Sequence, residues 1–143
     1  MKNGKILVGI THGDINGVGY EIILKLFSEP MMLELCTPII YGSPKVATYH
    51  RKAMELTTNF VTIQKGDEAV EGRLNLVDCL TDEVKIDFGQ PSAESGKAAL
   101  AALERAMADY REGLFDVLVT APINKATIQG DGFHFPGHTE YIQ

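Results

Sequence analysis

The residue types best suited to chemistry gather near the end of the chain. Thr120–Lys125 (TAPINK) and Phe133–Glu140 (FHFPGHTE) carry an amine, two imidazoles and two hydroxyls within a short stretch. They follow the apolar run Asp116–Thr120, which has the length and the β-branched content of a buried strand. The loop after such a strand lies at the carboxyl edge of a sheet, where open α/β sheets bind ligands. The sequence therefore predicts an anion-binding site there.

Two neighbouring residues, His138 and Thr139, are the best candidates for contact with a substrate. Both side chains can donate a hydrogen bond to an anionic oxygen, and the preceding Gly137 lets the backbone approach closely. Taken alone, such a pair is more typical of a helix cap, with Thr139 as N-cap before Glu140. Lys125 is a candidate either for substrate binding or for orienting the loop.

A second candidate loop lies near the amino terminus. Thr11–Gly17 connects a predicted strand, Lys5–Ile10, to a predicted helix, Val18–Ser28, and this geometry aims backbone N–H groups at an anion above the sheet. The loop reproduces neither the dinucleotide-binding nor the phosphate-loop glycine pattern. A plain tight turn in which Asp14 caps the helix or the turn remains the alternative.

Three blocks of sequence resemble one known family. The segment TAPINKATIQGDGFHFPGHTE (120–140) resembles the signature of the PdxA family, the 4-hydroxythreonine-4-phosphate dehydrogenases of vitamin B6 biosynthesis. The segment THGDINGVGYE (11–21) is similar to the family's T-x-G-D-P-x-G-I-G-P-E, with Ile15 and Tyr20 where the family usually has prolines, and ESGKAA (94–99) is also family-like. Family members are much longer than this chain, so the chain resembles their amino-terminal portion.

The resemblance implies a reaction, cofactors and an assembly. It implies NAD- or NADP-dependent oxidation of 4-phosphohydroxy-L-threonine, followed by loss of carbon dioxide to give 3-amino-2-oxopropyl phosphate, in a cytoplasmic homodimer. The reaction needs a hydride acceptor and a divalent metal (Zn, Mg or Co). His138 and Thr139 match the family's substrate-binding pair, and Lys125 also matches the family pattern. The fold expected from the resemblance is that of isocitrate and isopropylmalate dehydrogenases.

The metal ligands are not expected within this chain. A catalytic zinc commonly takes three protein ligands, often histidines. The chain has four histidines, at positions 12, 50, 134 and 138. His134 and His138 are four residues apart, but Pro136 and Gly137 between them make a shared helix face improbable, and we expect His50, beside Arg51, on the surface. The resemblance places the three metal-binding histidines downstream, so we do not expect a complete active site from this chain alone.

Strands and helices alternate along the rest of the chain. Further strands are predicted at 38–42, 60–63 and 74–77, and further helices at 43–56 and 93–112, which indicates an α/β layered fold with a mainly parallel sheet. We expect residues 1–129 to form a first lobe and residues 130–143 to begin crossing into a second. The expected inward-facing residues of the three helices are Ile22, Ile23, Leu26 and Phe27; Val46, Tyr49, Ala53 and Leu56; and Leu100, Leu103, Met107 and Tyr110. Ser95–Lys97 could face a cofactor or a subunit interface.

The composition excludes several classes of protein. A net charge of -6 argues against nucleic-acid binding, which depends on Lys and Arg neutralising phosphates. No stretch approaches the roughly 20 apolar residues of a membrane helix, and we expect no membrane partner. Cys36 and Cys79 lack metal-binding or redox spacing and are expected to be reduced, buried thiols.

Two alternatives to the first functional hypothesis remain open. One is a related dehydrogenase of another phosphorylated four-carbon acid, such as threonate or erythronate 4-phosphate. The other is a non-catalytic anion-binding α/β module. A chain that stopped at Gln143 would also be expected to expose apolar surface meant for further strands.

Overall fold

The computed structural model describes residues 4–13, 15, 16, 18–79 and 93–121. Along the chain these form β1 (Ile6–Thr11), α1 (Gly19–Leu26), α2 (Pro30–Leu35), β2 (Cys36–Gly42), α3 (Pro44–Ala53), β3 (Val61–Ile63), a 3-10 turn (Gly66–Glu68), β4 (Asn75–Asp78), α4 (Ala93–Arg111) and β5 (Val117–Thr120). The predicted second lobe, 130–143, lies outside the described residues.

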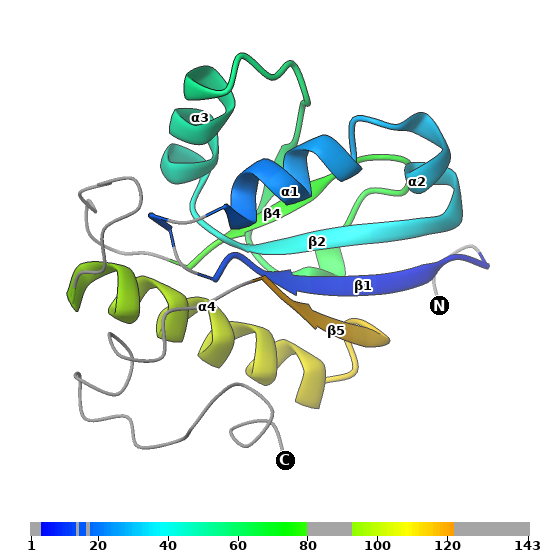
Figure 1. The fold of residues 1–143 in the computed structure, drawn as a ribbon. Coiled ribbons are helices and arrows are strands. Elements are labelled where there is room, and N and C mark those ends of the chain that lie inside the picture. Colours follow the sequence, from blue (N-terminus) through cyan, green and yellow to red (C-terminus); the bar gives the residue numbers. More distant parts are fainter. Residues whose placement is uncertain (1–3, 14, 17, 80–92, 122–143) are drawn as a thin grey trace.

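The five described strands form one sheet in the order β3-β4-β2-β1-β5, and every pair is parallel. Helices α1 and α3 pack over one face of this sheet and α4 over the other, with α2 beside β2 (Figure 1). The central strands are apolar on both sides because both faces are covered. The α/β layered fold predicted from the sequence is confirmed.

Alternate residues of β2 feed two separate apolar cores. Ile40 packs with the residues of α1 and α3, whereas Ile39 and Tyr41 pack with those of α4. This alternation follows from the period of two along a strand. A β-sheet between two helical layers therefore accounts for nearly all of the buried apolar side chains in the described part of the chain.

The predicted strands match the observed ones to within two residues at each end. No helix was predicted between the first helix and the second strand, whereas the structure has α2 there, with Pro30 in its first turn. Ser43 caps α3 as its sequence indicates, accepting a hydrogen bond from the Val46 N–H at 3.4 Å.

Some helix faces were predicted wrongly. Tyr49 and Ala53 of α3 are exposed rather than inward-facing, and Ile22 and Leu26 of α1 are about half exposed. In α4 the inner face is made by small residues: Ala98, Ala99, Ala102 and Ala106 are buried, as are Leu103 and Met107, whereas Tyr110 is exposed. Alanines let this helix approach the sheet closely, so the large apolar residues do not mark its inner face alone.

Both cysteines are free thiols, as expected, but they are partly rather than fully buried. Desolvation raises the pKa of Cys79 to about 12 and also raises the pKa of Cys36. Neither thiol is therefore set up as a nucleophile.

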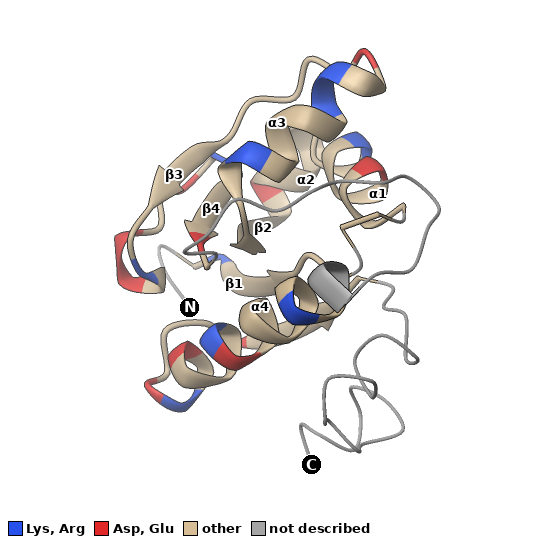
Figure 2. Ribbon diagram, turned by 90° about the vertical axis from the view of Figure 1, so that its left-hand side faces the viewer, with Lys and Arg blue, Asp and Glu red and all other residues tan. Residues whose placement is uncertain are grey.

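Charged residues of both signs mix over the outer surfaces of the helices, with no single basic face in the view of Figure 2. In the described part of the chain, no helix is both long and apolar enough to span a bilayer.

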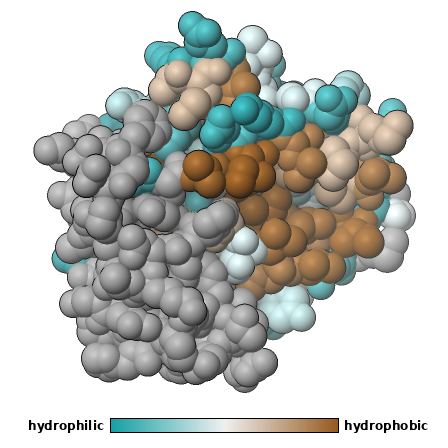
Figure 3. Space-filling model, viewed as in Figure 1, coloured by the Kyte–Doolittle hydropathy of each residue, from teal (hydrophilic) through white to brown (hydrophobic). Residues whose placement is uncertain are grey.

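One side of the molecule exposes apolar side chains. In Figure 3 they gather on the face that carries α1, β1 and β5. The exposed members include Ile22 of α1 and, on β5, Val117 and Val119, whose exposed fractions are 45% and 46%. β5 is an edge strand of the described sheet. A contiguous apolar surface at a strand edge is typical of a surface that other polypeptide covers.

Gly9 provides a direct test of the packing between β1 and the loop that precedes β5. A Cβ at this position would lie 2.6 to 2.8 Å from three ring atoms of Phe115. Because a well-packed core resists added volume, Gly9→Ala is expected to lower the free energy of unfolding by about 1–3 kcal/mol. Urea unfolding of the chain measures this loss. In the Phe115→Leu background the same substitution should cost less, and an equal cost in both backgrounds would contradict the contact.

Candidate functional site

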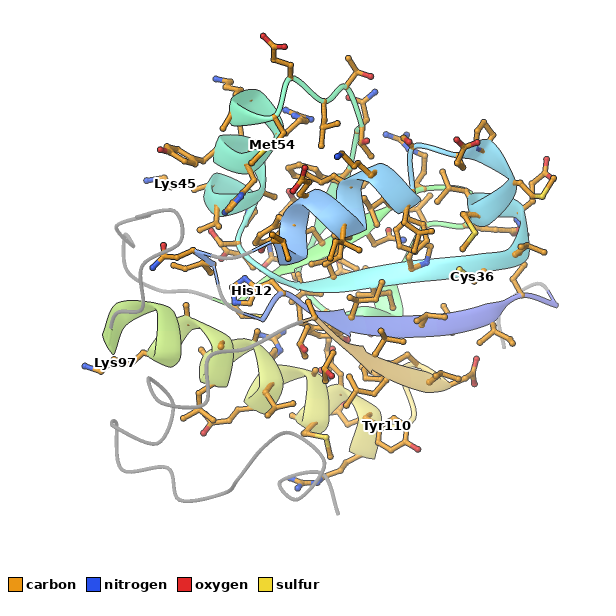
Figure 4. All side chains as sticks on the ribbon, viewed as in Figure 1. His12, Cys36, Lys45, Met54, Lys97 and Tyr110 are labelled. Atoms are coloured by element: carbon orange, nitrogen blue, oxygen red, sulfur yellow. The ribbon has the colours of Figure 1, made fainter. Side chains whose placement is uncertain are left out.

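The carboxyl ends of the strands form the edge that carries the candidate site. β1 ends at Thr11, β2 at Gly42 and β5 at Thr120, and α1 and α3 begin immediately beyond this edge. The positive ends of two helix dipoles therefore point toward it. Figure 4 shows His12, Lys45 and Lys97 at this end of the sheet and Cys36 at the other.

The residues predicted to bind substrate, Lys125, His138 and Thr139, lie outside the described residues. The structure does place the start of their segment. Thr120 pairs with Thr11, and the Ala121 N–H donates to the Thr11 carbonyl at 3.1 Å. The segment that contains the predicted site residues therefore leaves the sheet directly beside the amino-terminal loop.

A buried chain of hydrogen bonds holds the amino-terminal loop. The Ser43 N–H donates to the Tyr20 hydroxyl at 2.9 Å, and that hydroxyl lies 2.8 Å from His12 Nδ1. His12 Nε2 lies 2.9 Å from the Ala98 carbonyl. These hydrogen bonds join four places in the fold: the end of β1, the start of α1, the turn after β2, and α4. Both ring nitrogens of His12 and the tyrosine hydroxyl are thereby paired inside the protein.

These partners define the state of the His12 ring. The Ala98 carbonyl can only accept, so His12 Nε2 carries a hydrogen, and Nδ1 accepts from the Tyr20 hydroxyl. That arrangement requires the neutral imidazole. Burial lowers the pKa of His12 to about 4, opposed by the hydrogen bond to Ala98 and reinforced by the proximity of His50. Burial also raises the pKa of Tyr20, so its hydroxyl keeps its proton.

His50 is a buried residue, so the predicted surface position is wrong. Its side chain is fully buried, its Nε2 donates to the Ile15 carbonyl at 2.6 Å, and its ring stacks on Tyr20 with centroids 5.4 Å apart. The charged neighbours in the sequence, Arg51 and Lys52, suggested a solvated position. The imidazole instead reaches back from α3 to fix the middle of the loop.

The backbone around the loop leaves no room for larger residues. A Cβ on Gly42 would lie 2.8 Å from His12 Nδ1 and would overlap the Tyr20 hydroxyl, and a Cβ on Gly19 would lie 2.7 Å from the His12 carbonyl oxygen. Ile15 and Tyr20, which depart from the family pattern, are both fully buried. The two departures are therefore parts of the core.

Sequence reasoning missed the roles of His12 and Tyr20. The available signal was that Tyr20 opens a helix where the family pattern usually has a proline. A large aromatic residue with a hydroxyl in such a place needs both space and a polar partner. Gly42 provides the space and His12 provides the partner. The spacing of these residues along the sequence does not reveal that the fold brings them next to Tyr20.

The described residues do not form a metal centre. Among residues 4–13, 15, 16, 18–79 and 93–121, no group of three or more His, Cys, Asp or Glu side chains could hold an ion. Both nitrogens of the His12 ring are occupied by hydrogen bonds, and the His50 Nε2 is occupied by the Ile15 carbonyl.

Comparison with known proteins places this chain among one group of enzymes. The family model described as "Pyridoxal phosphate biosynthetic protein PdxA" matches residues 34–143. A 4-hydroxythreonine-4-phosphate dehydrogenase of Bacteroides thetaiotaomicron is 65% identical over 143 residues, which are 100% of this chain and 39% of that protein. A putative D-threonate 4-phosphate dehydrogenase of Clostridium botulinum is 34% identical and is covered over 43% of its length by 99% of this chain.

A solved structure agrees with the fold. The crystal structure of a 4-hydroxythreonine-4-phosphate dehydrogenase from Burkholderia phymatum matches with a TM-score of 0.89 at 30% identity, covering 98% of this chain and 43% of that one. This chain thus spans about two fifths of the length of the relatives that it matches.

The neutral His12 makes the stability of the chain depend on pH. Because its folded pKa of about 4 is below the unfolded value of 6.5, its contribution is present above 6.5 and is lost as the pH falls through 4. Going from about pH 7 to about pH 5 is expected to cost about 2 kcal/mol of unfolding free energy through this group. Urea unfolding at both pH values measures the difference.

His12→Gln is the matched variant for this measurement, because it removes the titrating ring and leaves the other titratable groups in place. It is expected to be less stable than the parent near pH 7 but to lose about 2 kcal/mol less on acidification. An identical loss in parent and variant would show that His12 is not the neutral buried group described above.

Proposed function

Because this chain belongs to the PdxA family of pyridoxal phosphate biosynthetic proteins, we propose that it is the amino-terminal part of a 4-hydroxythreonine-4-phosphate dehydrogenase. The proposed reaction is NAD(P)-dependent oxidation of 4-phosphohydroxy-L-threonine and loss of carbon dioxide from the β-keto acid. The observation that carries the proposal is the 65% identity to a dehydrogenase of that name, which extends over all 143 residues.

The charges at the carboxyl edge support an anionic substrate. Lys45 near the start of α3 and Lys97 near the start of α4 lie at the same end of the sheet as His12 (Figure 4). The amino termini of α1 and α3 add positive dipole ends at this edge. Local positive charge can attract a phosphorylated acid although the chain as a whole carries a charge of -6.

The substrate contacts belong to the segment that follows β5. His138 and Thr139 would donate hydrogen bonds to an anionic group of the substrate, and Lys125 would either bind that group or orient the loop. The position of Ala121 beside Thr11 supports this assignment, since it starts the segment next to the anchored loop. The fixed loop would form one wall of the site and keep water from that side.

A nicotinamide cofactor would supply the hydride acceptor, and a divalent metal (Zn, Mg or Co) is part of the same proposal. The described residues do not fit a metal, so its ligands would come from polypeptide outside them, and no step through it is assigned to this chain. A homodimer in the cytoplasm and a second lobe that begins at about residue 130 complete the proposal. The apolar surface on α1 and β5 supports further polypeptide packing there.

A second candidate is oxidation of D-threonate 4-phosphate. It is favoured by the 34% identity to the putative dehydrogenase of that substrate in Clostridium botulinum. The two substrates share the phosphate and differ at the carbon that carries nitrogen or oxygen. The higher identity to the first group places this candidate second.

Turnover by the gene product that contains this chain separates the two candidates. With NAD or NADP we expect reduction of the nucleotide on 4-phosphohydroxy-L-threonine, followed at 340 nm, and loss of this activity with a chelator. Turnover on D-threonate 4-phosphate without turnover on 4-phosphohydroxy-L-threonine would overturn the first candidate in favour of the second. Turnover on neither compound would remove both.

The proposed role of His138 is testable by a single substitution. His138→Ala removes a hydrogen-bond donor to a charged group, a loss of about 1.5–3 kcal/mol, so the KM for the substrate is expected to rise more than tenfold while the KM for the nucleotide stays within about twofold. His134→Ala is the nearby control. It is expected to change the KM for the substrate less than His138→Ala does and to leave the KM for the nucleotide similarly unaffected. Equal losses of affinity for substrate and nucleotide in His138→Ala would refute the assigned role.

A further inference from the structure

The Tyr20 hydroxyl links the loop after β1 to the turn after β2. It accepts from the Ser43 N–H at 2.9 Å and meets His12 Nδ1 at 2.8 Å. Ser43 is in turn the N-cap of α3, and His12 is the first residue after β1. One hydroxyl therefore couples the ends of two neighbouring strands at the carboxyl edge.

The surroundings of this hydroxyl are built to accommodate it. Gly42 has no side chain where a Cβ would overlap the hydroxyl. The Tyr20 ring stacks on His50, which holds the Ile15 carbonyl in the middle of the loop, and meets the His12 ring edge-on at 5.5 Å. All three rings are fully buried. Each ring contacts a different point around the loop, and the Tyr20 hydroxyl connects them to the turn after β2.

We propose that Tyr20 is a positioning residue for the reaction: its hydroxyl, through His12 and Ser43, sets the position of the loop between β1 and α1 against the carboxyl edge. This inference rests on the proposed function, because it assumes that substrate or nucleotide binds beside that loop. Its consequence is specific. Removing the hydroxyl alone impairs turnover without unfolding the protein, because the ring still fills its place in the core.

The same sheet offers a matched control in Tyr41. This side chain is also fully buried, and its hydroxyl donates to the Asp109 carboxylate at 2.7 Å on the opposite face, where the Gly66 N–H also binds that carboxylate at 3.1 Å. Tyr41→Phe thus removes an equally buried hydrogen bond to a charged group. That hydrogen bond lies between β2 and the carboxyl-terminal half of α4, away from the loop between β1 and α1.

The experiment compares Tyr20→Phe and Tyr41→Phe in the complete gene product. Because small displacements of a positioned group can cost up to about a hundredfold in rate, Tyr20→Phe is expected to lower kcat/KM at least about tenfold. Its melting temperature is expected to fall no further than that of Tyr41→Phe. Tyr41→Phe is expected to keep kcat/KM within about twofold of the parent. Equal losses of kcat/KM in the two variants would mean that Tyr20 acts only through general stability and would overturn the inference.

Hydrogen exchange gives a readout that does not depend on the substrate. In Tyr20→Phe, amide exchange is expected to accelerate in peptides that cover residues 12–20 and 43–46, and in Tyr41→Phe it should accelerate around 66–69 instead. Unchanged exchange at 12–20 in Tyr20→Phe would overturn the inference. A parent enzyme without turnover on either proposed substrate would refute the proposed function, while the exchange experiment would still decide whether Tyr20 positions the loop.

Discussion

The arrangement of this fold depends on one buried, neutral imidazole. His12 directly follows strand β1 and is bonded on one side to Tyr20 of α1 and on the other to the Ala98 carbonyl of α4. Those two helices cover opposite faces of the sheet (Figure 1). A single ring thus joins both helical layers at the edge where the strands end. Protonation of Nδ1 would remove the acceptor for the Tyr20 hydroxyl hydrogen and would place a charge in a fully buried site, so burial favours the uncharged ring.

The network also explains why the edge can serve as a site. A binding loop must be held in one geometry by residues that do not themselves bind the ligand. Here His12, Tyr20 and His50 use their polar atoms on backbone groups and on each other, and Gly19 and Gly42 let the backbone pack against them. The loop is thereby fixed, while the cations at Lys45 and Lys97 remain at the rim. The proposed substrate residues follow β5 in the sequence.

Much of this architecture was predictable from the sequence, and the failures have physical reasons. The apolar run 38–42 predicted a strand, and the observed β2 is almost entirely buried because both faces of the sheet are covered. On α4 the predicted Leu103 and Met107 are buried, but Tyr110 is exposed, and much of the inner face is made by alanines that a search for large apolar residues passes over. His50 was placed on the surface from its charged neighbours, whereas its role depends on a long-range contact with Ile15. The hydrogen bonds around His12 were not predicted for the same reason, since Tyr20, Ser43 and Ala98 are brought together only by the fold.

The protonation state of the His12 ring tests the central claim most directly. In a 15N-labelled sample, the two ring nitrogens of His12 report the tautomer and the charge by their chemical shifts. The account predicts a neutral ring at about pH 6, with Nε2 protonated and Nδ1 as acceptor, and titration only near pH 4. An imidazolium at pH 6, or a neutral ring protonated on Nδ1, would contradict it.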